Sequence, residues 1–323
     1  MPFQILALSG GGYLGLYTAE LLARLEQKAG RPLASCFDLV SGTSVGGILA
    51  IGLVLETGTE KMRDKFEREG EKIFSHRGRP RFGLWDARRS FCRAKYDGKQ
   101  LRAAVTDLIG GETKIGDAKH RLLVPAVNLT KGSVQMFKTG HHPNFKTDPH
   151  RNAVDVAMAT SAAPTYFPLA ESGYEQFADG GLVANAPDMC ALHEATHFLD
   201  QDVNDVSILS IGTTSTGFSI KRSLGRNLGS WKWMSRGRLF STMISAQQQL
   251  VEYILGHDLK DRYFRIDVHQ SPEQQADLGL DVADRSARET LLGLAEGSFQ
   301  RISTDDRLDK ILSHSAAKPK FFY

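Results

Sequence analysis

A serine stands at the centre of a short glycine-bounded stretch near the start of the chain. Residues 42–46 read Gly-Thr-Ser-Val-Gly and fit G-x-S-x-G, in which the serine lies on a sharp turn between a strand and a helix. Glycines permit the close backbone approach that this turn needs. The N-terminus of the following helix favours negative charge that develops at the hydroxyl. Ser44 is therefore the candidate nucleophile of an acyl transfer, with Gly42 and Gly46 supporting its turn.

A second glycine cluster lies upstream, where residues 9–15 read Ser-Gly-Gly-Gly-Tyr-Leu-Gly between an expected strand and an expected helix. Such a loop directs backbone N–H groups at an anion. The anion could be the phosphate of a dinucleotide, because the pattern G-x-G-x-x-G is present. It could also be the oxyanion of a tetrahedral intermediate, with Gly10, Gly11 and Gly12 as donors. The next expected strand ends without the acidic residue that binds ribose, so the sequence favours the oxyanion over a nucleotide-binding module.

An Asp-Gly-Gly turn at residues 179–181 follows a further expected strand. Asp-Gly alone is a common turn dipeptide. Beside the other two features, Asp179 becomes the candidate general base for Ser44, and Gly180 and Gly181 support its turn. The order serine, aspartate, histidine of the α/β-hydrolases keeps a triad open, since three histidines follow Asp179. The serine turn here follows only two strands, which favours a dyad; the three histidines are His193, His197 and His257.

Residues 193–197 read His-Glu-Ala-Thr-His, which is the zinc-binding pattern H-E-x-x-H. A zinc site of this kind needs a third ligand downstream. Nothing in the sequence fixes one, so a metallopeptidase is the less favoured alternative. We expect no metal and no cofactor.

The glycine loop, the serine turn and the Asp-Gly-Gly turn occur in the order typical of the patatin-like phospholipases, which this chain resembles. Residues 153–168 also resemble the block that precedes the aspartate in that family, and the likeness covers about residues 3–212. The resemblance implies a Ser44–Asp179 dyad that hydrolyses fatty acyl esters of membrane glycerophospholipids through an acyl-enzyme, without a catalytic histidine. The chain departs from the family at Leu14, where a basic residue often supports the oxyanion loop.

Within that family, residues 8–13 and a short C-terminal extension resemble the bacterial phospholipase effectors of cyclic-oligonucleotide (CBASS) anti-phage signalling. The resemblance implies activation by a cyclic dinucleotide. A constitutive lipase or esterase without nucleotide control is the alternative.

Two segments carry basic and aromatic residues together. Residues 77–102 hold nine basic against two acidic residues, and residues 218–240 hold six basic residues and no acidic one. Arginine beside aromatic rings suits an anionic membrane surface and also a nucleotide. A solvated basic loop is the plain alternative. The residues expected to contact an activator or a membrane are Arg77, Arg79, Arg81, Arg88, Arg89, Trp231 and Trp233.

The composition predicts one globular α/β unit. The 323 residues are 41% apolar and 24% charged, with a net charge of +3, and they suffice for one large domain over 1–323. In this domain, residues 213–323 would pack on the core and regulate it. No stretch of about 18 apolar residues occurs, the first strand begins at once, and the three cysteines show no disulfide spacing. We expect a cytoplasmic protein that acts peripherally on the inner membrane, forms a homo-oligomer if regulated, and binds no DNA or RNA.

Alternating strands and helices predict a three-layer α/β/α sandwich around a mainly parallel sheet. Strands are expected at 3–8, 36–40, 121–129, 133–138, 174–178, 206–212 and 262–268. Helices are expected at 14–28, 45–56, 59–75, 98–109, 152–160, 187–199, 238–256 and 284–312.

Overall fold

The structure is a computed structural model that describes residues 2–75, 93–214 and 217–323. Its strands form one sheet in the order β5-β6-β3-β2-β1-β7-β8, and β4 also pairs with β3. The neighbouring strands β3, β2, β1, β7 and β8 run parallel to one another. The remaining strands β4, β5 and β6 form antiparallel pairs. The strand bounds are β1 Phe3–Leu8, β2 Leu39–Gly42, β3 Leu122–Asn128, β4 Ser133–Lys138, β5 Ala170–Ser172, β6 Glu175–Asp179, β7 Val206–Ile211 and β8 Tyr263–Ile266.

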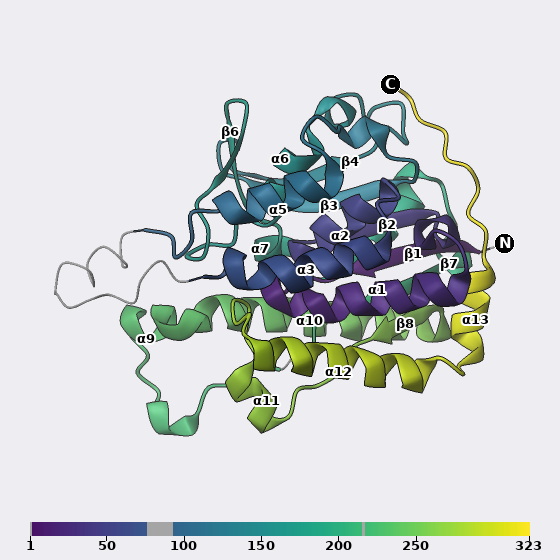
Figure 1. The fold of residues 1–323 in the computed structure, drawn as a ribbon. Coiled ribbons are helices and arrows are strands. Elements are labelled where there is room, and N and C mark those ends of the chain that lie inside the picture. Colours follow the sequence, from purple (N-terminus) through teal and green to yellow (C-terminus); the bar gives the residue numbers. More distant parts are fainter. Residues whose placement is uncertain (1, 76–92, 215–216) are drawn as a thin grey trace.

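Helices cover both faces of this sheet, which confirms the expected three-layer α/β/α fold (Figure 1). Side chains alternate along β1, so that Leu6 and Leu8 join one buried cluster while Ile5 and Ala7 join the other. The first face carries α1 Gly15–Ala29, α2 Val45–Val54, α3 Thr59–Ile73, α5 Lys99–Ile109, α6 Ala153–Thr160, α12 Arg285–Ile302 and α13 Asp306–Ser313. The second face carries α8 Asp188–His193 and α10 Arg238–Asp258.

Several elements differ from the sequence expectation. The single helix expected at 284–312 is two helices, because the Asp305 side chain accepts from the Arg307 N–H and starts a new helix there. The helix expected at 187–199 ends as α8 and continues as a π-helical turn, Glu194–Phe198. Four short elements were not predicted: β5, α7 Gly181–Ala184, α9 Ser230–Met234 and α11 Pro272–Asp277.

The part of the chain beyond residue 213 contributes to the same sheet and the same core. Strand β8 pairs with β7, and α12 packs along α1. In the described ranges, the search for a helix of sufficient length and hydrophobicity to cross a membrane found none.

The register of the central strands positions the site. Leu8 at the end of β1 lies opposite Gly42 at the end of β2. The glycine loop that follows β1 and the serine turn that follows β2 therefore leave the sheet side by side, at its carboxyl edge.

Candidate active site

Ser44 occupies a strained turn between β2 and α2. Its backbone has φ 55° and ψ −125°, which a residue with a side chain seldom adopts. The turn is tight enough to exclude a methyl group at either flanking glycine. A Cβ at Gly42 would lie 2.1 Å from the Gly46 carbonyl oxygen, and one at Gly46 would lie 2.4 Å from the Leu8 oxygen. The residues expected to support the turn are thus needed for its backbone packing.

Asp179, at the end of β6, meets the serine directly. The Ser44 hydroxyl donates to Asp179 Oδ2 at 2.8 Å, and the Gly181 N–H donates to Oδ1 at 2.6 Å. The carboxyl group is 1% exposed. Burial raises the pKa of Asp179 to about 7, although the hydrogen bonds from Gly181 and Ser44 partly oppose that rise. Among the described side chains no cation pairs with this carboxylate. A base with a pKa near neutrality is well suited to take a proton from a serine.

Two threonines hold the serine turn against the aspartate turn. The Ser44 N–H donates to Thr160 Oγ1 at 3.0 Å, and that hydroxyl donates to the Pro125 carbonyl at 2.6 Å. Thr43 Oγ1 donates to the Ala184 carbonyl at 2.6 Å. Gly180 lies so close to β3 that a Cβ there would be 2.3 Å from the Pro125 oxygen. The geometry of the pair is therefore fixed by contacts with β3, α6 and α7.

The three glycines expected as oxyanion donors do not have equal roles. The Gly10 N–H donates to the Asn185 carbonyl at 2.9 Å. The Gly10 carbonyl accepts from Asn185 Nδ2 at 3.2 Å and from Thr213 Oγ1 at 3.0 Å. Gly10 thus anchors the loop and its N–H is engaged, which corrects the expectation that it donates to an oxyanion. The N–H groups of Gly11 and Gly12 make no hydrogen bond to any residue in the described ranges, and both residues line the pocket with Ser44.

The outer side of this loop is covered by the C-terminal part of the chain. The Tyr13 N–H donates to the Leu280 carbonyl at 2.8 Å. Gly12 has φ +56°, and a Cβ there would lie 2.2 Å from the same oxygen. Leu280 therefore occupies space that a dinucleotide pyrophosphate would need, and the geometry favours an oxyanion hole over a nucleotide site.

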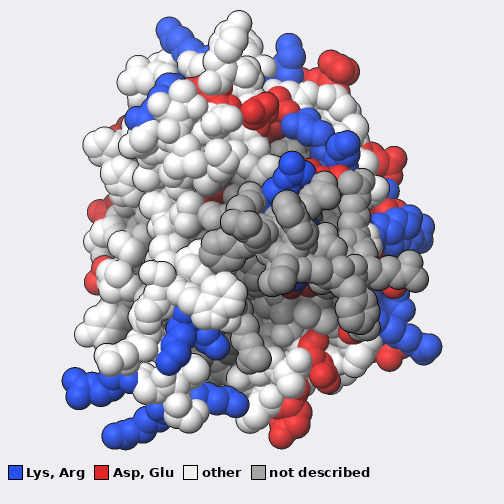
Figure 2. All heavy atoms as spheres, turned by 90° about the vertical axis from the view of Figure 1, so that its left-hand side faces the viewer, with Lys and Arg blue, Asp and Glu red and all other residues white. Residues whose placement is uncertain are grey.

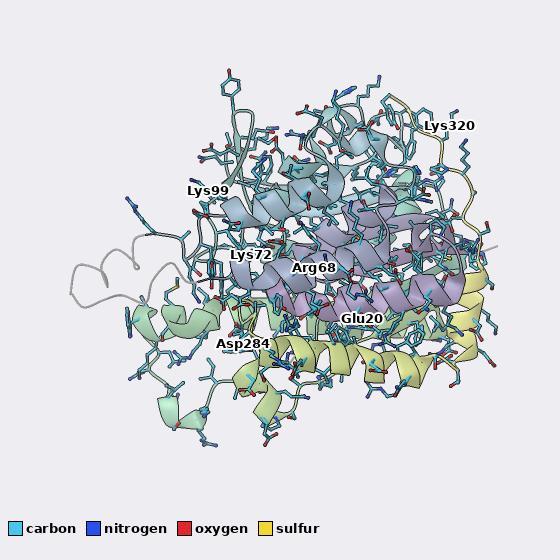
Figure 3. All side chains as sticks on the ribbon, viewed as in Figure 1. Glu20, Arg68, Lys72, Lys99, Asp284 and Lys320 are labelled. Carbon is cyan, nitrogen blue, oxygen red and sulfur yellow. The ribbon has the colours of Figure 1, made fainter. Side chains whose placement is uncertain are left out.

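The dyad opens into an apolar pocket of about 700 Å³, part of which is open to solvent. Its walls come from the end of α3, the start of α5, the start of α10 and the segment before α12. Figure 3 labels Lys72, Lys99 and Asp284, which mark three of these places and lie toward one end of the molecule. Apolar wall residues include Val45, Ile48, Phe74, Phe167, Phe240 and Ile244. Such a wall fits a hydrocarbon chain.

Comparisons with known proteins agree with this geometry. Residues 6–189 match the family model described as patatin-like phospholipase. The chain belongs to the patatin-like phospholipase family. It is 44% identical to a cGAMP-activated phospholipase of Pseudomonas aeruginosa, over 99% of this chain and 95% of that protein. Proteins of the same name from Vibrio cholerae and Escherichia coli are 37% and 34% identical over 89% of this chain, and the alignments cover 88% and 86% of those proteins. The chain is therefore a hydrolase of the phospholipase type.

In this patatin-like phospholipase the H-E-x-x-H stretch has a structural environment. Glu194 is buried, and it pairs with Lys138 at 2.5 Å and with His141 at 2.9 Å. His193 and His197 are exposed and stack on each other. The described residues contain no group of three or more His, Cys, Asp or Glu side chains placed to hold a metal ion. Within those same ranges no histidine hydrogen-bonds to Ser44 or Asp179, and His257 instead bonds to the Tyr253 carbonyl.

The basic and aromatic segments are described only in part. Arg77, Arg79, Arg81, Arg88 and Arg89 lie outside the described residues. Trp231 in α9 is 70% exposed, and Trp233 is half-buried. Figure 2 looks onto the end of the molecule where α9 lies and shows Lys and Arg side chains at the lower edge of that face. The exposed basic residues of the α9 region are Lys221, Arg222, Arg226 and Lys232.

Sequence reasoning did not assign roles to four residues that position the site. Thr160 lies in the block 153–168 and Asn185 lies six residues after Asp179, so both were inside recognised stretches without a role. Thr213 and Leu280 carry no local signal. They reach the glycine loop only because β7 and the segment before α12 pass beside it. The positioning residues missed were Thr160, Asn185, Thr213 and Leu280.

Proposed function

We propose that this protein hydrolyses fatty acyl esters of membrane glycerophospholipids with Ser44 as nucleophile and Asp179 as general base. The 2.8 Å hydrogen bond between their side chains, at the bottom of an apolar pocket, is the observation that carries the proposal. The family of the chain supports the substrate class.

In the first half of the reaction Ser44 Oγ attacks the ester carbonyl carbon while its proton passes to Asp179 Oδ2. The N–H groups of Gly11 and Gly12 stabilise the oxyanion, each by about 3–4 kcal/mol if well placed. Collapse of the intermediate breaks the ester bond, and the departing alkoxide takes the proton from Asp179. In the second half Asp179 accepts a proton from water, which attacks the acyl-enzyme carbonyl. The bond to Ser44 Oγ then breaks, Asp179 returns the proton to Ser44 Oγ, and the fatty acid is released.

We further propose that a cyclic dinucleotide switches this activity on, as the names of the three relatives state for those proteins. The basic segment around Trp231 and Trp233 leads directly into α10. From α10, Gln247 Nε2 donates to the Leu182 carbonyl at 2.9 Å, and its Oε1 accepts from the Asn185 N–H at 3.2 Å. An activator at this segment would therefore act on the turn that follows Asp179. The role of the enzyme would be anti-phage defence, at the inner face of the cell membrane.

The test is fatty acid release from vesicles of phosphatidylethanolamine and phosphatidylglycerol, with and without cyclic GMP-AMP. Wild type should release fatty acid only with the nucleotide, and Ser44→Ala should release none. Replacing both Trp231 and Trp233 by alanine should abolish activation by the nucleotide, while Ser44 should still react with a fluorophosphonate.

Release without the nucleotide would retain the phospholipase and remove the switch, leaving a constitutive lipase. Release by Ser44→Ala would overturn the dyad. Static light scattering with and without the nucleotide would test whether activation involves a homo-oligomer.

A further inference from the structure

A second apolar pocket lies next to the catalytic one, and the proposed mechanism makes no use of it. Its volume is about 260 Å³, part of which is open to solvent. It lies between α3 and α5, which pack side by side (Figure 1). Its lining away from the catalytic pocket comes from Lys65, Ala104, Val105 and Leu108.

The two pockets adjoin each other. Ile48, Phe66, Ile73 and Leu101 line both of them. The helices α3 and α5 run in opposite directions, since Lys65 pairs with Asp107 at one end while Ile73 and Leu101 line the same pocket at the other. The second pocket therefore continues the first along the groove between these helices. From Ile73 to Phe66 this path covers about 10 Å at the helical rise per residue.

A charged residue, Lys65, borders the second pocket away from the catalytic site. Lys65 lines the pocket, while its ammonium group pairs with Asp107 on α5 and lies 4.0 Å from Glu69. The Lys65 side chain is 23% exposed. Its hydrocarbon part thus faces the apolar space and its charge faces outward, which is the usual arrangement of a lysine at the edge of an apolar surface.

We propose that this second pocket binds the distal part of the substrate's acyl chain and sets the chain-length preference of the enzyme. The inference rests on the proposed function, because the chain must be attached to the carbonyl at Ser44. Phe66 lies along the whole path, since it lines both pockets, and the small side chain of Ala104 lines only the second pocket, where the chain end would lie. Each methylene withdrawn from water should tighten binding about fourfold.

Two neighbouring alanines of α5 provide a matched pair of variants. Ala104 lines the pocket, whereas Ala103 is exposed on the same helix. Ala104→Phe would place a ring in the second pocket, and Ala103→Phe would place the same ring in solvent. Both changes carry a similar cost in helix propensity.

The first measurement is equilibrium binding of octanoate, dodecanoate and hexadecanoate to the full chain, by displacement of a fluorescent fatty acid. Ala104→Phe should weaken hexadecanoate binding roughly tenfold or more and leave octanoate within about twofold. Ala103→Phe should behave as wild type with all three. Equal binding by the two variants at every chain length would overturn the proposal.

A second variant covers the case in which Ala104→Phe does not fold. Phe66→Leu shortens a side chain that lines both pockets and so widens the path between them, so the ratio of hexadecanoate to octanoate affinity should rise about threefold or more. An unchanged ratio in a folded Phe66→Leu protein would equally overturn the proposal.

Labelling of Ser44 by alkyl fluorophosphonates, followed by intact mass, separates this proposal from the catalytic one. If long-chain labelling is lost only in Ala104→Phe, both stand. If no fluorophosphonate of any length labels Ser44 while fatty acid binding keeps the expected chain-length pattern, the dyad fails and the acyl pocket stands.

Discussion

Two buried carboxylates of this protein have opposite surroundings. Asp179 and Glu194 are each 1% exposed. Glu194 faces a lysine and a histidine, and the ammonium of its partner Lys138 also lies 4.3 Å and 4.2 Å from the ring centroids of Phe145 and Phe198. Among the described residues, Asp179 hydrogen-bonds to a serine hydroxyl and a backbone N–H and pairs with no cation.

The difference shows how burial can serve either stability or chemistry. A buried charge is tolerated when a partner compensates the lost hydration, as at Glu194. Without such a partner the charged form is disfavoured, and the pKa of Asp179 rises to about 7. A carboxylate that is costly to keep charged is also ready to accept a proton. The H-E-x-x-H motif around Glu194 resembles a zinc-binding catalytic signature, yet Glu194 is held in an ion pair. Asp179, which pairs with no cation among the described residues, is the carboxylate suited to accept a proton.

The largest expected effect is on turnover. Asp179→Asn keeps the shape of the side chain and removes the base, so we expect fatty acid release to fall about 10³-fold to 10⁴-fold. Vesicle assays with activator would measure it. Glu194→Gln, assayed on the folded fraction, should stay within about threefold of wild type, and a comparable loss in both variants would remove the distinction between the two carboxylates.

Glu194→Gln should instead destabilise the fold. It leaves the Lys138 ammonium and His141 buried without their carboxylate, which typically costs about 3–5 kcal/mol. Urea unfolding monitored by fluorescence would measure the free energy. In the double variant with Lys138→Met the loss should be smaller, since no uncompensated cation remains; a larger loss would contradict the ion-pair explanation.

Asp179→Asn should raise stability at pH 8, by about 2–4 kcal/mol. The folded protein retains the Asp179 proton up to its pKa of about 7, whereas the unfolded chain releases it near the ordinary value of 3.8. Stability of the wild type is therefore lost as pH rises from about 4 to 7, and the asparagine variant lacks this loss. Thermal unfolding at pH 5 and pH 8 would measure this, and the stability difference between Asp179→Asn and wild type should be smaller at pH 5. An advantage that grew on acidification would contradict the raised pKa.

Activity of the wild type should fall by roughly tenfold for each pH unit below about 6, because Asp179 must be deprotonated to act as base. The measurement is kcat/KM on a soluble ester between pH 5 and 9, with an enzyme shown to remain folded. A profile flat down to pH 5 would mean that the working base has an ordinary carboxyl pKa.

The smallest effect is expected at the exposed histidines. His193→Gln and His197→Gln should change activity less than about twofold, and EDTA should leave it unchanged, since neither ring contacts the dyad. A loss of activity on chelation that zinc restores would revive the metal interpretation.

Local patterns sufficed for the strands that carry the site and for singling out Ser44 and Asp179, whose side chains the structure brings into hydrogen-bond contact. Glycines on either side of Ser44 and after Asp179 report a backbone constraint that is local, so the sequence expresses it directly. The mostly parallel sheet also followed from the alternation of strands and helices. The exact ends of helices did not, because caps such as Asp305 compete with continued helical periodicity.

Contacts between distant segments could not be anticipated in the same way. The N–H of Gly10 is engaged by Asn185, and nothing near Gly10 in the chain announces this partner. Glu194 likewise needed β4 and the loop after it to supply Lys138 and His141. The residues whose roles could not be predicted are those whose partners are distant in the chain and come close only through the order of strands in the sheet.

The contact between Leu280 and the glycine loop means that the active site can be completed only late in co-translational folding, after residue 280 has been made. The loop after β1 is synthesised long before residue 280, but its outer side is formed by Leu280, and the pocket wall includes Phe240 and Ile244. A nascent chain thus carries the serine and the aspartate long before it has a finished site. We therefore expect a nascent chain to gain activity only after residue 280 has emerged and folded, and a break in the chain before residue 280 to abolish activity.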